Sequence, residues 1–203
     1  MAAFLFALAG LLASPTPVEL GPAEEVALAA SAAPADLARG AGVYRLGAAG
    51  YELVRPSANG FYCLVGRDPE QGIAPACYDA EGAATVMQAQ LLRGALLRRG
   101  LADAEIEQEI AARYRDGRLL APRRAGVAYM LSHRFSRYDA RRGRRTCVFP
   151  PHVMIYAPYR TNEEIGNGPG DRGSLTQPWI LHEGAPDAYI IVAMAHGRAA
   201  RCE

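Results

Sequence analysis

Cys63 and His152 are the residues of this sequence whose types most directly suggest covalent catalysis. A cysteine thiolate becomes an effective nucleophile when an imidazole lies within hydrogen-bonding distance and a third group orients the ring. Cys63 follows the Asn59-Gly60 turn, which could present its thiol, but its flanking residues match no protease motif. The competing interpretation is a disulfide between Cys63 and Cys77, which would exclude the nucleophile because a bonded sulfur is not a thiol.

A catalytic metal site is the second chemistry that the residue types allow. Three nitrogen or oxygen ligands that converge around an open position would suit zinc. The candidate ligands are His152, His182, Glu183 and His196. Their spacing is diffuse, with no H-E-x-x-H, no H-x-H and no C-x-x-C pair. The sequence therefore predicts no cofactor, and a metal-assisted hydrolase stays an alternative.

A polar group of residues follows the predicted strand HVMIYA and could bind a small ligand. Residues at the end of a strand and the start of a loop are held by a rigid scaffold yet remain accessible. The candidates are Tyr156, Tyr159, Arg160, Asn162 and Glu164. The alternative interpretation is that Thr161 or Asn162 caps a short helix and Tyr156 fills the core.

Several other functions are not supported by the sequence. It contains no G-x-S-x-G elbow, no P-loop and no dinucleotide-binding fingerprint. The cluster RRGRR at 141–145 could contact phosphates. The chain is nearly neutral, however, with 22 basic and 21 acidic residues. We therefore interpret the cluster as a solvated turn and expect no nucleic-acid partner, with an anionic polymer or membrane surface as the lesser alternative.

The N-terminal residues indicate export. The first thirteen residues are apolar apart from Gly10, and small residues with A-x-A spacing occur at Ala27 and Ala29. The apolar run fits a signal peptide and is too short for a stable transmembrane anchor. We predict a signal peptide at 1–29, a linker at 30–41 rich in alanine, and one domain at 42–203 that works in the periplasm or outside the cell.

The chain has four cysteines, which is an even number and typical of an exported protein with disulfides. Three pairings are possible in principle. Cys63 with Cys77 is favoured because the intervening RDPEQGIAP is expected to be a loop, whose closure contributes roughly 3 kcal/mol in the chain-entropy model. Cys147 with Cys202 would then hold the C-terminal tail.

The order of predicted elements determines the fold class. Short extended segments in 43–65 predict three antiparallel strands, or at least a hairpin centred on 57–60. Asp79 is expected to cap a long helix that ends at Gly100, and a second helix is expected over 103–117. GVAYML, HVMIYA and DAYIIVAM predict further strands. This order predicts an α+β fold, with a mainly antiparallel sheet and a helical hairpin packed on it.

Four segments together resemble a family of small exported bacterial proteins that has no assigned activity. They are NGFYCLV at 59–65, ACYD at 76–79, GVAYML at 126–131, and PHVMIYAP with Thr161 and Asn162. The resemblance covers roughly 43–192. It implies a bacterial, exported protein and supports a domain that starts near Gly42, but it implies no catalytic residue.

These observations favour a non-catalytic module that binds a small ligand or a cell-envelope component. The alternative is a hydrolase that uses His152, either with Cys63 as nucleophile or with a bound metal. The substrate, the partner and the oligomeric state are not determined by the sequence.

Overall fold

The computed structural model describes residues 17–68, 71–168 and 171–194. The helices in these residues are α1 (Pro22–Ala30), α2 (Ala35–Gly40), α3 (Ala80–Ala84), α4 (Val86–Arg98), α5 (Asp103–Arg115) and the short 3₁₀ helix η1 (Glu163–Ile165). The strands are β1 (Gly42–Leu46), β2 (Tyr51–Arg55), β3 (Tyr62–Arg67), β4 (Ile73–Tyr78), β5 (Val127–Met130), β6 (Ser136–Asp139), β7 (Arg144–Cys147), β8 (His152–Tyr156), β9 (Trp179–Leu181) and β10 (Tyr189–Ala193).

The strands form a mixed sheet with the order β2-β1-β3-β4-β5-β8-β10-β9, and β6 joins it through β4 and carries β7. β1 and β3 pair in parallel, whereas the other pairs are antiparallel. The α+β class is confirmed, but the expectation of a mainly antiparallel sheet needs correction to a mixed one. The predicted hairpin at 57–60 is wrong, because β1 lies between β2 and β3. Asn59 instead binds α2, where its Nδ2 donates to the Leu37 carbonyl at 2.8 Å.

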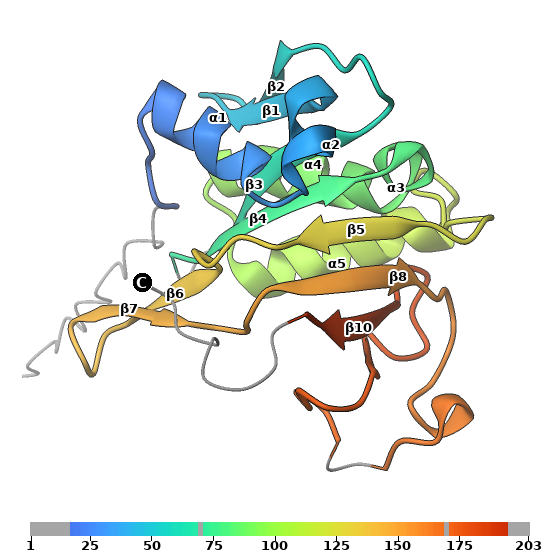
Figure 1. The fold of residues 1–203 in the computed structure, drawn as a ribbon. Coiled ribbons are helices and arrows are strands. Elements are labelled where there is room, and N and C mark those ends of the chain that lie inside the picture. Colours follow the sequence, from blue (N-terminus) through green and yellow to red (C-terminus); the bar gives the residue numbers. More distant parts are fainter. Residues whose placement is uncertain (1–16, 69–70, 169–170, 195–203) are drawn as a thin grey trace, which may run out of the picture.

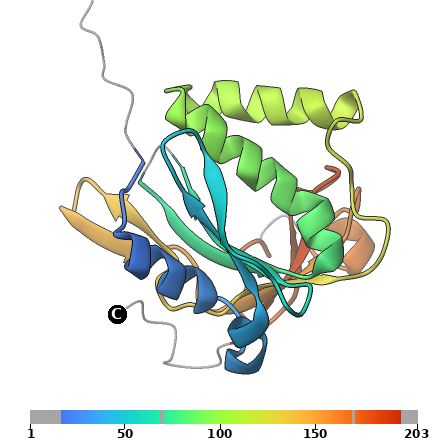
Figure 2. The same ribbon diagram turned by 90° about the horizontal axis from the view of Figure 1, so that it is seen from above.

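Helices cover both faces of the sheet. Figure 2 shows α1 and α2 on one side and α4 and α5 on the other, with the strands between them. α4 packs on β3 and β2, and α5 packs on α4 through Ile106 and Ile110. The predicted end signals are confirmed: Asp79 accepts a hydrogen bond from Gly82 N, and Gly100 and Gly117 have positive φ. No helix in the described residues is long and apolar enough to cross a bilayer.

The segment expected to be a linker at 30–41 is part of the packed structure, which corrects that expectation. Ala32, Ala33 and Ala41 are buried, because their small side chains allow close approach of the helices to the sheet. α1 is also integrated: its Glu25 carboxylate is buried and lies 3.0 Å from the Arg67 guanidinium of β3. The predicted signal peptide at 1–29 would include all of α1 except its last residue. Residues 1–16 lie outside the described residues.

Cys63 and Cys77 form a disulfide between β3 and β4, as predicted. The two residues are direct cross-strand partners in the antiparallel register, so the bond joins neighbouring strands within the buried face below α1. The stretch that was expected to be only a loop contains the last residue of β3 and the first three residues of β4. Cys147 ends β7, and Cys202 lies outside the described residues, so the second pairing stays a prediction.

Candidate functional site

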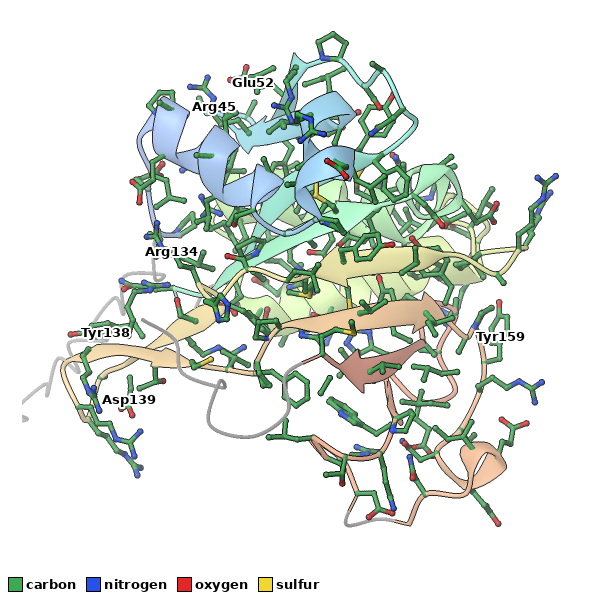
Figure 3. The ribbon with its side chains drawn as sticks, viewed as in Figure 1. Arg45, Glu52, Arg134, Tyr138, Asp139 and Tyr159 are labelled. Carbon is green, nitrogen blue, oxygen red and sulfur yellow. A yellow bond between two sulfur atoms is a disulfide. The ribbon has the colours of Figure 1, made fainter. Side chains whose placement is uncertain are left out.

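A cleft of about 550 Å³ lies between α5 and the loop at 182–187 that follows β9. Three α5 side chains in one helical row form one wall: Glu107, Ala111 and Tyr114, spaced four and three residues apart. The opposite wall comes from the 182–187 loop and from Tyr159, just after β8. Figure 3 shows Tyr159 beyond the end of β8, on the opposite side of the molecule from the β6–β7 hairpin.

Two residues of this wall have strained backbone conformations. Tyr159 and His182 have φ angles of 65° and 55°, in the left-handed region that is unfavourable for residues with a Cβ atom. Their turns are joined by two hydrogen bonds: Gly184 N donates to Arg160 O at 2.9 Å, and Tyr159 N donates to Ala185 O at 2.8 Å. The junction of the two turns therefore fixes both conformations. Strain of this kind is concentrated at functional sites.

His182 and Asp187 form a pair at the edge of the cleft. The distance from His182 Nδ1 to Asp187 Oδ2 is 3.0 Å, which leaves Nε2 as the second ring nitrogen available for other contacts. The hydrogen bond and charge of Asp187 raise the pKa of His182 above its ordinary value of 6.5, against a smaller opposite effect of burial. The pair can therefore accept or donate a proton at Nε2, or hydrogen-bond a ligand there.

Tyr114 has a buried hydroxyl oxygen with no hydrogen-bond partner among the described residues. Burial raises the pKa of this hydroxyl, and the nearby Asp187 carboxylate adds to the effect, so the group is neutral. A buried hydroxyl without a partner is unfavourable by about 1–3 kcal/mol. Since Tyr114 lines the cleft, a turn of its ring toward the opening would let a polar group of a bound molecule supply the missing hydrogen bond.

Asn162, a predicted binding residue, acts instead as a support for this loop. Its Oδ1 accepts a hydrogen bond from Ile180 N at 2.7 Å, while its Nδ2 donates to Ile180 O at 3.0 Å and to Glu183 Oε2 at 2.8 Å. Asn162 and Arg172 together lower the pKa of Glu183. This buried amide thus connects η1 to β9 and holds the start of the 182–187 loop.

The other predicted binding residues do not gather at one place. Tyr156 is buried in the core, where its hydroxyl lies 3.0 Å from Asp79 Oδ1 and 2.9 Å from Val127 O. Arg160 and Glu164 are paired with each other at 3.0 Å on the surface. Of the five residues, Tyr159 lines the cleft. The pattern "end of strand, start of loop" therefore selected one residue that lines the cleft, and the binding role of the five residues stays a prediction.

The structure contradicts a Cys63–His152 catalytic pair. The disulfide leaves Cys63 no thiol, and the strand register places the two side chains on opposite faces of the sheet. His152 is 3% exposed and packs against Phe135 and Phe149, with Nδ1 2.8 Å from Pro150 O. Burial lowers its pKa, so this histidine is a neutral core residue.

The candidate metal ligands are dispersed. Among the described residues, no group of three or more histidine, cysteine, aspartate or glutamate side chains could hold a metal ion. His152 is in the core, Glu183 is engaged by Asn162 and Arg172, and His182 is paired with Asp187. His196 lies outside the described residues.

No family model, no curated protein and no solved structure matches this chain. The cleft must therefore be interpreted from its own geometry.

Three important residues of the cleft were not identified from the sequence: Glu107, Tyr114 and Asp187. The helical spacing of Glu107, Ala111 and Tyr114 was a visible signal that these residues share one face of α5. No comparable local signal connects Asp187 with that helix, because the contact between the two segments depends on the tertiary fold.

Proposed function

We propose that this chain is a non-catalytic module that binds a small ligand, free or as a unit of a cell-envelope component, in the cleft between α5 and the 182–187 loop. The observation that carries the proposal is the unpartnered, buried hydroxyl of Tyr114 in a cleft whose other wall holds two strained residues, Tyr159 and His182. In this proposal α4 and α5 form the predicted helical hairpin, which holds Tyr114 over the cleft.

The charged side chains of the cleft do not favour a cationic ligand, because Arg115 lines it together with three carboxylates that have partners. Its three carboxylates already have partners, since Glu107 pairs with Arg93, Asp187 with His182, and Glu183 with Arg172. Carboxylates paired in this way still accept hydrogen bonds from hydroxyl groups but attract a free cation less strongly.

The apolar part of the wall indicates what else the ligand must contain. The rings of Tyr114 and Tyr159, together with Ala111 and Pro186, offer surface to an apolar face. A sugar ring combines an apolar face with several hydroxyl groups, so we assign a neutral saccharide as the ligand class.

The proposed setting is the periplasm or the exterior of a bacterial cell. A buried disulfide within the sheet is the feature that supports an oxidising compartment.

Isothermal titration calorimetry with the β-1,4-linked trimer of N-acetylglucosamine tests the proposal. Tyr159→Ala removes one wall and is expected to weaken binding about tenfold, the equivalent of about 1.4 kcal/mol. Tyr114→Phe removes only the unpartnered hydroxyl, so it is expected to weaken binding while leaving the free energy of unfolding unchanged or slightly higher.

Tyr138→Ala is the matched control, because Tyr138 is also an exposed tyrosine but lies on the β6–β7 hairpin far from the cleft (Figure 3). If all three substitutions weaken trimer binding equally, or if none of them does, the cleft is not the binding site. Binding of choline in place of the trimer would show that the assigned ligand class is wrong.

A second candidate function is hydrolysis with His182 as general base, and the His182–Asp187 pair is the observation that favours it. Nε2 of His182 would take a proton from water as the water oxygen attacks the substrate, and would return that proton to the leaving group. Mass spectrometry of the trimer after incubation distinguishes this function from binding. Cleavage that is lost in His182→Ala would establish the hydrolase, and an intact trimer would leave the binding module.

A further inference from the structure

Positive charge is concentrated in and next to the β6–β7 hairpin. Six of the 22 basic residues and one of the 21 acidic residues lie between positions 134 and 145, whereas the rest of the chain has more acidic than basic residues. Figure 1 shows this hairpin extending away from the body of the sheet, at the side opposite the turn that follows β8. The charge is therefore placed on this projecting hairpin, residues 136–147, which we call the finger, rather than spread over the surface.

The internal pairing of the finger leaves its tip positive. Arg142 lies 3.4 Å from Asp139, and Arg137 lies 3.1 Å from Asp68. Arg141 and Arg144 are exposed and make no ion pair within the part of the chain that the structure describes. Exposed ion pairs contribute little to stability, so folding does not require this number of arginines.

Positive charge is also crowded at the base of the finger. The Arg145 guanidinium is partly buried, with Nε 3.1 Å from Ser136 Oγ. Burial and the neighbouring charges of Arg134 and Arg67 lower the pKa of Arg145. An external anionic surface would relieve this repulsion between like charges.

Apolar side chains accompany the arginines. Tyr138 on β6 is 42% exposed, and Val148, directly after β7, is 44% exposed. Figure 3 shows Tyr138 on the projecting hairpin, beside Asp139. Tyrosine with neighbouring arginines is a combination that suits the boundary between water and lipid, where the ring lies at the level of the headgroups and the charges contact phosphates.

We propose that the β6–β7 hairpin docks this protein on the surface of an anionic lipid bilayer. The projecting, convex shape favours a flat surface over a polymer strand or a peptide, both of which are usually bound in a groove. The hairpin docks by its tip, so that Arg141, Arg142 and Arg144 contact the lipid phosphates and Tyr138, on the opposite face of the hairpin from Arg144, enters the headgroup region. This interaction is independent of ligand binding in the α5 cleft.

Co-sedimentation with vesicles tests the proposal. The full chain is mixed with vesicles of phosphatidylglycerol and phosphatidylcholine, and separately with vesicles of phosphatidylcholine alone, at low and high salt. We expect binding to the anionic vesicles that weakens with salt. Each basic residue near such a surface strengthens partitioning about fivefold, so the triple variant R141Q/R142Q/R144Q should bind about a hundredfold more weakly.

The matched control is R39Q/R123Q/R124Q, which removes the same charge from exposed positions outside the hairpin. Thermal unfolding of both triple variants verifies that they are folded. Equal losses in the two triple variants, or binding that does not distinguish the two kinds of vesicle, would overturn the proposal. Retention on heparin without binding to anionic vesicles would also overturn it, because the finger would then serve a soluble anionic polymer.

Discussion

The strained conformation of Tyr159 leads to a prediction about the relative stability of two substitutions. Tyr159 is 62% exposed, and its side chain makes no hydrogen bond among the described residues, yet its φ is 65°. A left-handed backbone is unfavourable by roughly 1–2 kcal/mol for a residue with a Cβ atom. Alanine at position 159 retains this strain, and glycine removes it.

The magnitude of the difference follows from two opposing terms. Glycine at position 159 relieves strain, which raises the free energy of unfolding by roughly 1–2 kcal/mol. It also increases the entropy of the unfolded chain, which lowers the free energy of unfolding by about 0.4–1 kcal/mol. Tyr159→Gly should therefore be more stable than Tyr159→Ala by about 0.5–1 kcal/mol. In ordinary helix or strand conformations the order is reversed, with glycine less stable than alanine by roughly 0.5–1 kcal/mol.

Urea unfolding and thermal melts of both variants measure this difference. For a chain of this size, 1 kcal/mol corresponds to about 2–4 °C in the melting temperature. The comparison pair is Tyr138→Gly and Tyr138→Ala, since Tyr138 is an exposed tyrosine in the strand β6. Tyr138 should show the ordinary order and Tyr159 the inverted one. The same order at both positions would refute the argument that strain is stored at the cleft.

Three further predictions concern buried and titrating groups. Glu25→Ala leaves the buried Arg67 guanidinium without its carboxylate and should lower the free energy of unfolding in urea by about 3–5 kcal/mol, whereas the exposed Asp36→Ala should change it by less than about 0.5 kcal/mol. Similarly small effects of both substitutions would show that the buried ion pair does not stabilise the fold. Because the pKa of His182 is raised, its hydrogen bond with Asp187 stabilises the fold fully below pH 6.5 and less as the pH rises through the folded-state pKa. His182→Gln should therefore be more destabilising at pH 5.5 than at pH 8.5. A loss of stability that does not depend on pH would contradict the pairing. The lowered pKa of His152 has the opposite effect on the pH dependence, because the unfolded chain binds the proton more readily than the folded one. The protein should therefore lose stability as the pH falls through 6.5. His152→Phe should remove that part of the loss, even if the variant is less stable at pH 8.

Local sequence signals predicted local structure well. Asp79 caps α3 and Gly117 follows the end of α5, because capping and left-handed glycines act within a few residues. Glu109 and Arg113 are paired at 2.7 Å on α5, as their spacing of four predicts. The expected single helix is divided at Thr85 into α3 and α4, and the Thr85 hydroxyl donates a hydrogen bond to the Glu81 carbonyl.

Expectations that depended on strand pairing were less successful. Asn59-Gly60 is a strong local turn signal, yet the strands on either side of it, β2 and β3, do not pair with each other. The turn packs on α2, and the chain passes from one side of β1 to the other, because β1 pairs in parallel with β3. β4 was not anticipated, since it contains Pro75, and β6 and β7 were hidden in an arginine-rich stretch expected to be a turn. Residues 30–41 are rich in alanine and contain one bulky apolar side chain, Leu37, but small side chains were what the close helix–sheet contact required.

By itself, the sequence determined the class of fold, the proximity of Cys63 and Cys77 and the ends of α5, because each depends on residues that are near one another in the chain. The tertiary structure decided where the cleft lies. The α5 cleft brings together a helix row ending at Tyr114, the turn at Tyr159 and the loop from His182 to Asp187, which lie tens of residues apart. Their conformations are imposed by hydrogen bonds between these segments, and the left-handed backbone of Tyr159 and His182 runs against local preference. A site formed by such long-range contacts leaves no continuous pattern in the sequence.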